Sequence, residues 1–199
     1  MFRSRSNHRS DSGFTLMEVV IAVALVAILA VSLGPLVMKN LQDGKVSRAQ
    51  SDVQAIGNAI ETFYKDTGSW PNTQNDGTGT VDYLTSSPTI LVAATGGITF
   101  TSQDDNTTLS NQLILNTPTY STSTRPHLSA GWNGPYMGAD SLDPWGMPYV
   151  VNMEYVGDAT HTVLVVSAGP NKTYDSFGTT PETSTGTDDL CYVLQKNSQ

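Results

Sequence analysis

The first forty residues show a sharp change in hydropathy. A short polar segment, residues 1–13, is followed at once by an apolar run from Phe14 to Met38 that holds a single charged residue, Glu18. A helix rises about 1.5 Å per residue and needs about 20 apolar residues to cross the hydrocarbon layer of a membrane. The run is long enough, and it predicts a transmembrane helix.

Beyond Met38 the pattern becomes amphipathic. Apolar residues recur at alternating spacings of three and four, which places them on one side of a helix. They are Val46, Ala49, Val53, Ile56, Ile60 and Phe63. Charged residues off this stripe are spaced for i,i+4 ion pairs, Arg48 with Asp52 and Glu61 with Lys65. The helix is therefore expected to continue to about Lys65, where Gly68 and Pro71 end it, and to pack on a sheet.

The C-terminal third carries strand patterns. Residues 149–155 alternate between apolar and polar, which predicts a strand with one buried face, and residues 161–167 predict a more buried strand. A turn at 157–160 joins them into an antiparallel hairpin, and residues 190–194 resemble a further strand. The expected fold class is α+β, with a long N-terminal helix whose second half packs on a small antiparallel sheet.

Residues 71–130 are rich in Thr, Ser, Asn and Gly and predict an insertion with some strand content. Its short apolar runs are Thr89–Ala94, Ile98–Thr101 and Gln112–Leu115. All three have the composition of β-strands, and their turns are not defined by the pattern.

Charge and composition narrow the function. The net charge is −8 and charged residues make up only 14% of the chain, which favours an exported acidic surface over a nucleic-acid-binding one. The arginines of the first 13 residues should stay on the cytoplasmic side of the membrane, so the C-terminal part crosses it. The one cysteine, Cys191, excludes an intrachain disulfide and is expected to be a small buried residue.

Glu18 is the residue that a plain signal anchor does not explain. A carboxylate in an apolar helix costs about 2.5–3.5 kcal/mol at the centre of a membrane, so it is expected to have a partner. Cleavage between Gly13 and Phe14 would free an amino group four residues before Glu18. The amine of one subunit could then pair with Glu18 of its neighbour and set the stagger between them.

The phrase from Gly13 to Glu18, GFTLME after a short basic leader, resembles the class III signal of type IV prepilins and pseudopilins. The resemblance implies that a prepilin peptidase cuts after Gly13 and methylates Phe14, and that Glu18 guides assembly. Pro35 matches a proline common in that family, where the helix is expected to weaken or kink.

Two further phrases are similar to those of the major pseudopilins of type II secretion systems, GWNGPY at 131–136 and LDPWGMPY at 142–149. The family implies a structural subunit, with no catalysis, of a pseudopilus that assembles in the inner membrane and drives protein secretion. Its partners would be other copies of the chain, bound through the N-terminal helix, the prepilin peptidase, an assembly platform and minor pseudopilins. Its C-terminal domain would be periplasmic. A surface type IV pilin for adhesion, motility or DNA uptake stays open as the alternative.

The chain then divides into five parts: a leader (1–13), a transmembrane and polymerisation helix (14–38), an amphipathic helix (39–70), a variable insertion (71–130) and a C-terminal antiparallel sheet with a candidate calcium loop (131–199).

The candidate calcium ligands are implied by the same family. They are Asn171, Asp175, Asp188 and Asp189, whose oxygens suit a cation that takes six to eight oxygen ligands. Asn171 stands where the family phrase tends to have aspartate, and Lys172 adds a positive charge, so the alternative of solvated turn residues remains open. The three histidines, His8, His127 and His161, are too scattered to predict a zinc site.

Overall fold

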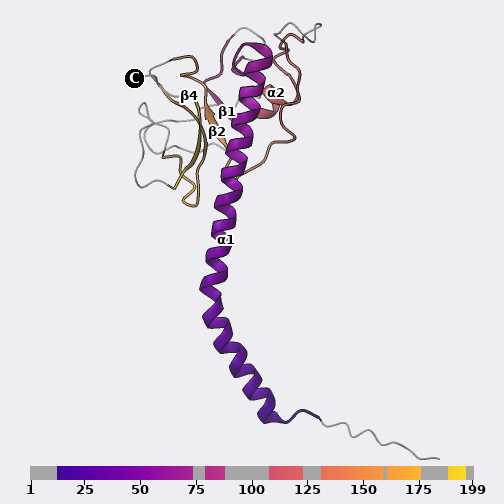
Figure 1. Ribbon diagram of the computed structural model, residues 1–199, viewed down its shortest axis with the longest axis vertical. Helices are drawn as coiled ribbons and strands as arrows, with labels where there is room; N and C mark the ends of the chain where they lie inside the picture. Colours follow the sequence, from indigo (N-terminus) through magenta and orange to yellow (C-terminus); the bar gives the residue numbers. More distant parts are fainter. Residues whose placement is uncertain are drawn as a thin grey trace, which may run out of the picture. The chain divides into compact units, whose positions relative to one another are not determined.

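The computed structural model describes residues 13–73, 79–87, 108–122, 131–158, 161–175 and 188–195. The chain forms two compact units, residues 1–43 and residues 44–199, and the division between them falls inside the first helix. The helices are α1 (Leu16–Thr67) and α2 (Leu109–Leu113), and the strands are β1 (Tyr83–Thr85), β2 (Val150–Asn152), β3 (Val163–Ser167) and β4 (Leu190–Gln195) (Figure 1).

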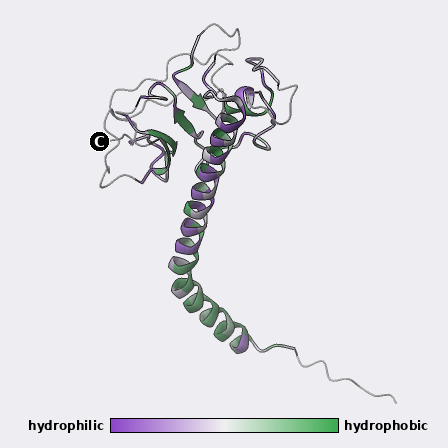
Figure 2. Cartoon of the chain, turned by 45° about the horizontal axis from the view of Figure 1, so that its top comes forward, coloured by the Kyte–Doolittle hydropathy of each residue, from purple (hydrophilic) through white to green (hydrophobic). Residues whose placement is uncertain are grey.

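The first half of α1 is apolar on every side and no other part of the described chain covers it. Its most apolar window of 18 residues has a mean hydropathy of 2.8 and is 0% buried. Figure 2 shows this stretch as mostly hydrophobic and the following turns as a mixture of hydrophilic and hydrophobic residues. By length and composition the helix can cross a membrane, as the sequence predicts. The helix runs without interruption through Pro35, which lies inside it.

The second half of α1 buries the predicted stripe. Ala49, Val53, Ile56, Ile60 and Phe63 are all buried, and Val46 is half-buried. The helix ends at Thr67, where the N–H of Gly68 donates to the carbonyl of Tyr64 (2.8 Å). Gly68 has φ +72°, the left-handed conformation that glycine adopts without strain at a helix end.

The four strands form one antiparallel sheet in the order β1-β2-β3-β4. The predicted hairpin is β2 and β3, with Val150 opposite Val166 and Val151 opposite Val165. Strand β4 lies at the sheet edge, with Ser167 opposite Leu190. The sequence-based prediction of strands at 161–167 and 190–194 is confirmed, and β1 was not predicted.

Both faces of the sheet are buried, which corrects the expectation of one buried face for 149–155. On one face, Tyr149, Val151 and Met153 pack with the stripe of α1. On the other face, Val150 joins a second cluster that includes Tyr174. The strand itself is three residues long because a turn starts at residue 154.

Two further expectations are wrong. The run 112–115 was predicted as β-like, but its first two residues belong to helix α2 (Leu109–Leu113). The first turn of α2 is capped by the hydroxyl of Thr108, which accepts from the N–H of Asn111. Cys191 is exposed, because it lies on edge strand β4 and alternates with Tyr192, which packs against the core. The runs 89–94 and 98–101 lie outside the described residues.

Candidate functional site

The start of α1 places Glu18 within a hydrogen-bonded turn. Thr15 precedes the helix, and its backbone N–H and its hydroxyl both donate to Glu18 Oε2, each over 3.1 Å. The Thr15 hydroxyl oxygen accepts from the backbone N–H of Glu18 at 3.3 Å. This reciprocal pair is a capping box, in which two backbone donors that the helix leaves unsatisfied are bonded by side chains.

The bond predicted to be cut lies outside the helix. Gly13 and Phe14 precede the capped turn and are exposed, Phe14 at 87% of its surface. Because the helix begins at Leu16, the peptide bond between Gly13 and Phe14 has no helical hydrogen-bond pattern to unwind. The structure thus places an accessible backbone and a carboxylate within one turn of each other. The cleavage itself, the methylation and the assembly roles of Glu18 and Pro35 stay predictions.

Two tyrosines of the sheet unit bind carboxylates of α1. The hydroxyl of Tyr149, on a fully buried side chain, donates to Asp52 Oδ2 (2.7 Å), and Arg48 Nε lies 3.5 Å from the same oxygen. The hydroxyl of Tyr192 donates to Glu61 Oε1 (2.9 Å). Burial raises the pKa of Tyr149, and its bond to Asp52 raises it further, so the hydroxyl stays a donor. These two links fix α1 against the sheet.

The phrase at 142–149 forms a turn around a buried carboxylate. Asp143 is 4% exposed; its Oδ1 accepts from the backbone N–H groups of Trp145 (3.0 Å) and Met147 (2.8 Å). Its Oδ2 accepts from the hydroxyl of Ser167 at the end of β3 (2.7 Å). This phrase has a structural role, because one carboxylate holds the turn to the sheet.

A second acidic residue, Asp140, stabilises α2. Its Oδ2 accepts from the backbone N–H of Ser110, in the first turn of that helix (3.2 Å). Partial burial of the carboxyl raises its pKa to about 6, although the bond from Ser110 acts in the opposite direction.

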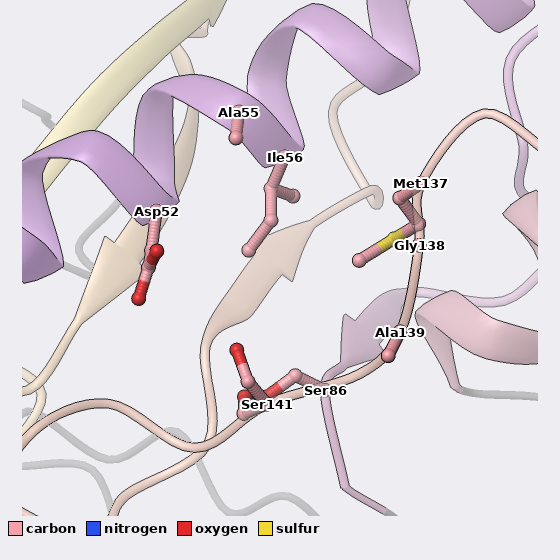
Figure 3. A pocket seen from close by; sticks show the side chains of 8 residues that line it. All are labelled: Asp52, Ala55, Ile56, Ser86, Met137, Gly138, Ala139 and Ser141. Carbon is pink, nitrogen blue, oxygen red and sulfur yellow. The ribbon is translucent and has the colours of Figure 1, made fainter.

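A small pocket lies beside the second half of α1 (Figure 3). Its volume is about 140 Å³. Asp52 and Ile56 of α1 face Ser86 and the segment from Met137 to Ser141 across it. Among the described residues that line the pocket, Asp52 is the one ionisable residue, and it already bonds Tyr149 and Arg48.

The four predicted calcium ligands do come together. Asp188 Oδ2 accepts from the backbone N–H of Asn171 (2.8 Å), and Asp189 Oδ2 accepts from that of Asp175 (2.8 Å). The side-chain amide of Asn171 donates to Asp175 Oδ2 (3.2 Å).

As placed, however, these side chains do not fit a calcium ion. Each aspartate has an oxygen directed at an N–H group, and the one buried oxygen of the set without a hydrogen-bond partner among the described residues is Oδ1 of Asp189. No group of three or more His, Cys, Asp or Glu within the described ranges is arranged to hold a metal. Calcium binding stays a prediction. Of the histidines, His161 bonds Asp158 (2.6 Å) in the β2–β3 turn, and His8 and His127 lie outside the described residues.

Comparison with protein families finds two successive matches. The family model of the prokaryotic N-terminal methylation motif matches residues 8–34. The model of type II secretion system protein G matches residues 36–119. The first match covers the capping box and most of the apolar half of α1, and the second covers the amphipathic half and α2.

Curated relatives carry the same name, type II secretion system core protein G. The protein of Pseudomonas aeruginosa is 38% identical over 66 residues, which are 33% of this chain and 46% of the relative. That of Aeromonas hydrophila is 33% identical over 81 residues, 41% of this chain and 54% of the relative. The Escherichia coli K12 protein is 27% identical over 161 residues, 80% of this chain and 81% of the relative.

The matched region thus spans about half the length of the first two relatives. No solved structure matches the chain significantly. The two family models follow one another in the order of a methylated N-terminal helix and a pseudopilin domain, on a fold of one long helix and an antiparallel sheet. Over residues 8–119 the chain is therefore similar to proteins with the prokaryotic N-terminal methylation motif and to the protein G family of type II secretion systems.

Proposed function

We propose that this chain is a structural subunit of a type II secretion pseudopilus, assembled in the inner membrane through its N-terminal helix. The observation that carries the proposal is Glu18, an exposed carboxylate in the first turn of an exposed apolar helix. Such a helix is covered either by lipid or by other helices. Transfer from lipid to a bundle of like helices leaves the apolar surface buried in both states, so a polar contact can decide the register.

Glu18 supplies that contact once the leader is removed. Cleavage after Gly13 gives Phe14 a positive amino group at the same depth as the carboxylate of an adjacent, staggered subunit. The attraction of two opposite charges is strong where water is excluded, and an unpaired charge there is costly. A pair between neighbours therefore favours one stagger over all others.

The role that follows is mechanical. The subunit waits in the inner membrane with its N-terminus cytoplasmic and residues 44–199 periplasmic, and it joins a filament of its own copies that drives secretion. The prepilin peptidase, an assembly platform and minor pseudopilins are its proposed partners. What supports secretion over the alternative of a surface type IV pilin is the name shared by the relatives, core protein G.

The test begins with the intact mass of the protein recovered from membranes of cells with and without a prepilin peptidase. We expect loss of residues 1–13 and gain of one methyl group only when the peptidase is present. In parallel, Glu18→Ala and Glu18→Asp variants are examined for filaments. We expect none with alanine, and few with aspartate, whose shorter side chain keeps the charge but not the reach. Full-length protein in both strains, or normal filaments with Glu18→Ala, would refute the proposal.

Secretion and surface display are separated by a deletion strain. If loss of the chain abolishes export of the cell's secreted enzymes and leaves twitching motility and DNA uptake unchanged, the secretion function holds. The reverse pattern would identify a surface pilin.

A further inference from the structure

We infer that the junction between the 169–175 loop and Asp188–Asp189, here called the clasp, is closed by hydrogen bonds in this chain and needs no calcium ion. Asn171 is the residue that replaces the cation. The inference concerns how the sheet unit is stabilised and does not depend on the secretion function. It departs from the calcium site that the family resemblance implies.

The sheet itself brings the two sides of the clasp together. Ser167 ends β3 and Leu190 begins β4, and these two residues are opposite one another in the ladder. The segments beyond them leave the same end of the sheet. Gly169 then lies so close to Asp188 that an added Cβ would be 2.3 Å from its carbonyl oxygen, and Gly169 has φ +64°. No metal ion is needed to bring the backbones into contact.

The far side of the loop is anchored independently. Tyr174 is 1% exposed and packs in the second core cluster, and its hydroxyl donates to the carbonyl oxygen of Pro148. Burial raises the pKa of this phenol, with smaller contributions from Asp143 and Asp189, so it remains a neutral donor. Loop residues 169–175 are thus held between the core and the start of β4.

Within the clasp, one oxygen of each of the two aspartates before β4 is bonded by an N–H group. Asp188 and Asp189 each accept a backbone N–H over 2.8 Å, from Asn171 and Asp175. The side-chain oxygen Oδ1 of Asn171 accepts from the backbone N–H of Thr173 (2.6 Å). A calcium ion needs six to eight oxygens directed at one point. The three oxygens named here are directed at separate donors, and Oδ1 of Asp189 is a buried oxygen that has no hydrogen-bond partner within the described part of the chain.

The residue at position 171 decides whether the clasp is closed by hydrogen bonds or by a calcium ion. The Asn171 side-chain nitrogen is 3.2 Å from Asp175 Oδ2, where it donates a hydrogen bond. An aspartate at 171 would place two carboxylates at that distance, and like charges so close repel unless a cation lies between them. Lys172 follows directly, exposed and with φ +63°, and its positive charge reduces the attraction for calcium further.

The test measures the melting temperature of the full-length protein in detergent micelles by tryptophan fluorescence, in EGTA and in excess calcium. A site with a dissociation constant of about 10⁻⁴ M, saturated a hundredfold, would raise the melting temperature by about 5–10 °C. We expect a shift of less than about 1 °C for the wild type. A rise of about 5 °C or more in calcium, with magnesium inactive, would overturn the inference.

The variant Asn171→Asp supplies the positive control. Its melting temperature in EGTA is expected to fall below that of the wild type, and calcium should recover most of the loss. Asn171→Ala removes the same donor without adding a carboxylate, so its loss should not be recovered by calcium. An Asn171→Asp protein as stable in EGTA as the wild type would show that the amide bond does not hold the clasp, and would overturn the inference.

Discussion

Gly57 tests how tightly the sheet packs against α1. An ideal Cβ at this position would lie 2.2 Å from Cδ1 and 2.3 Å from Cε1 of the Tyr192 ring, far inside ordinary contact. Gly44, in the same helix, has nothing within 4 Å of an added Cβ. Alanine at the two positions therefore compares the same gain in helix propensity with and without a steric conflict.

The expected magnitudes follow from that contrast. Alanine is preferred over glycine inside a helix by about 0.8–1.0 kcal/mol, so Gly44→Ala should stabilise the protein by about that amount. At Gly57 the ring must move by about 1 Å, which costs about 1–3 kcal/mol as overpacking. The movement also disturbs the bond from Tyr192 to Glu61, which contributes about 1 kcal/mol. Gly57→Ala should therefore destabilise the protein by about 1–2 kcal/mol.

The assay is thermal unfolding in detergent micelles, followed by the fluorescence of Trp70, Trp132 and Trp145, which all lie in the second unit. We expect the melting temperature to rise by about 2–4 °C for Gly44→Ala and to fall by about 2–8 °C for Gly57→Ala. In a Tyr192→Leu background the substitution at 57 should no longer destabilise. A Gly57→Ala protein that is stabilised as much as Gly44→Ala would refute the reasoning.

Three further predictions use the same melting assay. Asp143→Ala leaves the buried N–H of Met147, the part-buried N–H of Trp145 and the hydroxyl of Ser167 without their acceptor, and should lower the free energy of unfolding by about 3 kcal/mol. A loss below about 1 kcal/mol would contradict this role. Tyr149→Phe removes the bond to Asp52 and should cost about 1–2 kcal/mol, whereas its effect in an Asp52→Asn background should be smaller. The pKa of Asp140, about 6, is raised above its ordinary value of 3.8, so its protonated form is favoured by folding. The stability that the protonated carboxyl of Asp140 contributes is fully present below about pH 4 and is lost as the pH rises through 6. The difference in free energy of unfolding between Asp140→Asn and the wild type should shift in favour of the variant by about 1 kcal/mol from pH 4 to pH 7, after allowance for partial exposure of the carboxyl. Parallel pH profiles of stability for the two proteins would exclude the effect.

The long helix and the core hairpin could be predicted because their signals are local and repeated. The stripe of α1 extends over several turns, and its members are buried as expected except Val46, which is half-buried. The tyrosine links were missed because each joins residues far apart in sequence, 97 positions between Asp52 and Tyr149 and 131 between Glu61 and Tyr192. The sequence did hold a partial signal, because Asp52 and Glu61 both flank the buried stripe. They were assigned only to ion pairs within the helix.

Short elements gave too little pattern to predict. Strand β1 has three residues and α2 has five, so neither displays a full period. The apolar run at 112–115 fits a strand or one turn of helix equally well. Thr108, whose hydroxyl caps α2, was the signal that would have favoured helix.

The capping box at the start of α1 was also readable from the sequence, as Thr15 followed three residues later by Glu18. It changes the energetics of the proposed assembly contact. Two bonds from Thr15 reduce the cost of holding the carboxylate in a membrane before any partner arrives. When the amine of a neighbouring subunit displaces these bonds, the free energy gained is only the difference between the new ion pair with Glu18 and the lost hydrogen bonds from Thr15. The net preference for one stagger is thus smaller than the strength of the ion pair alone, and it should increase when Thr15 is replaced by valine, while insertion of the monomer becomes less favourable.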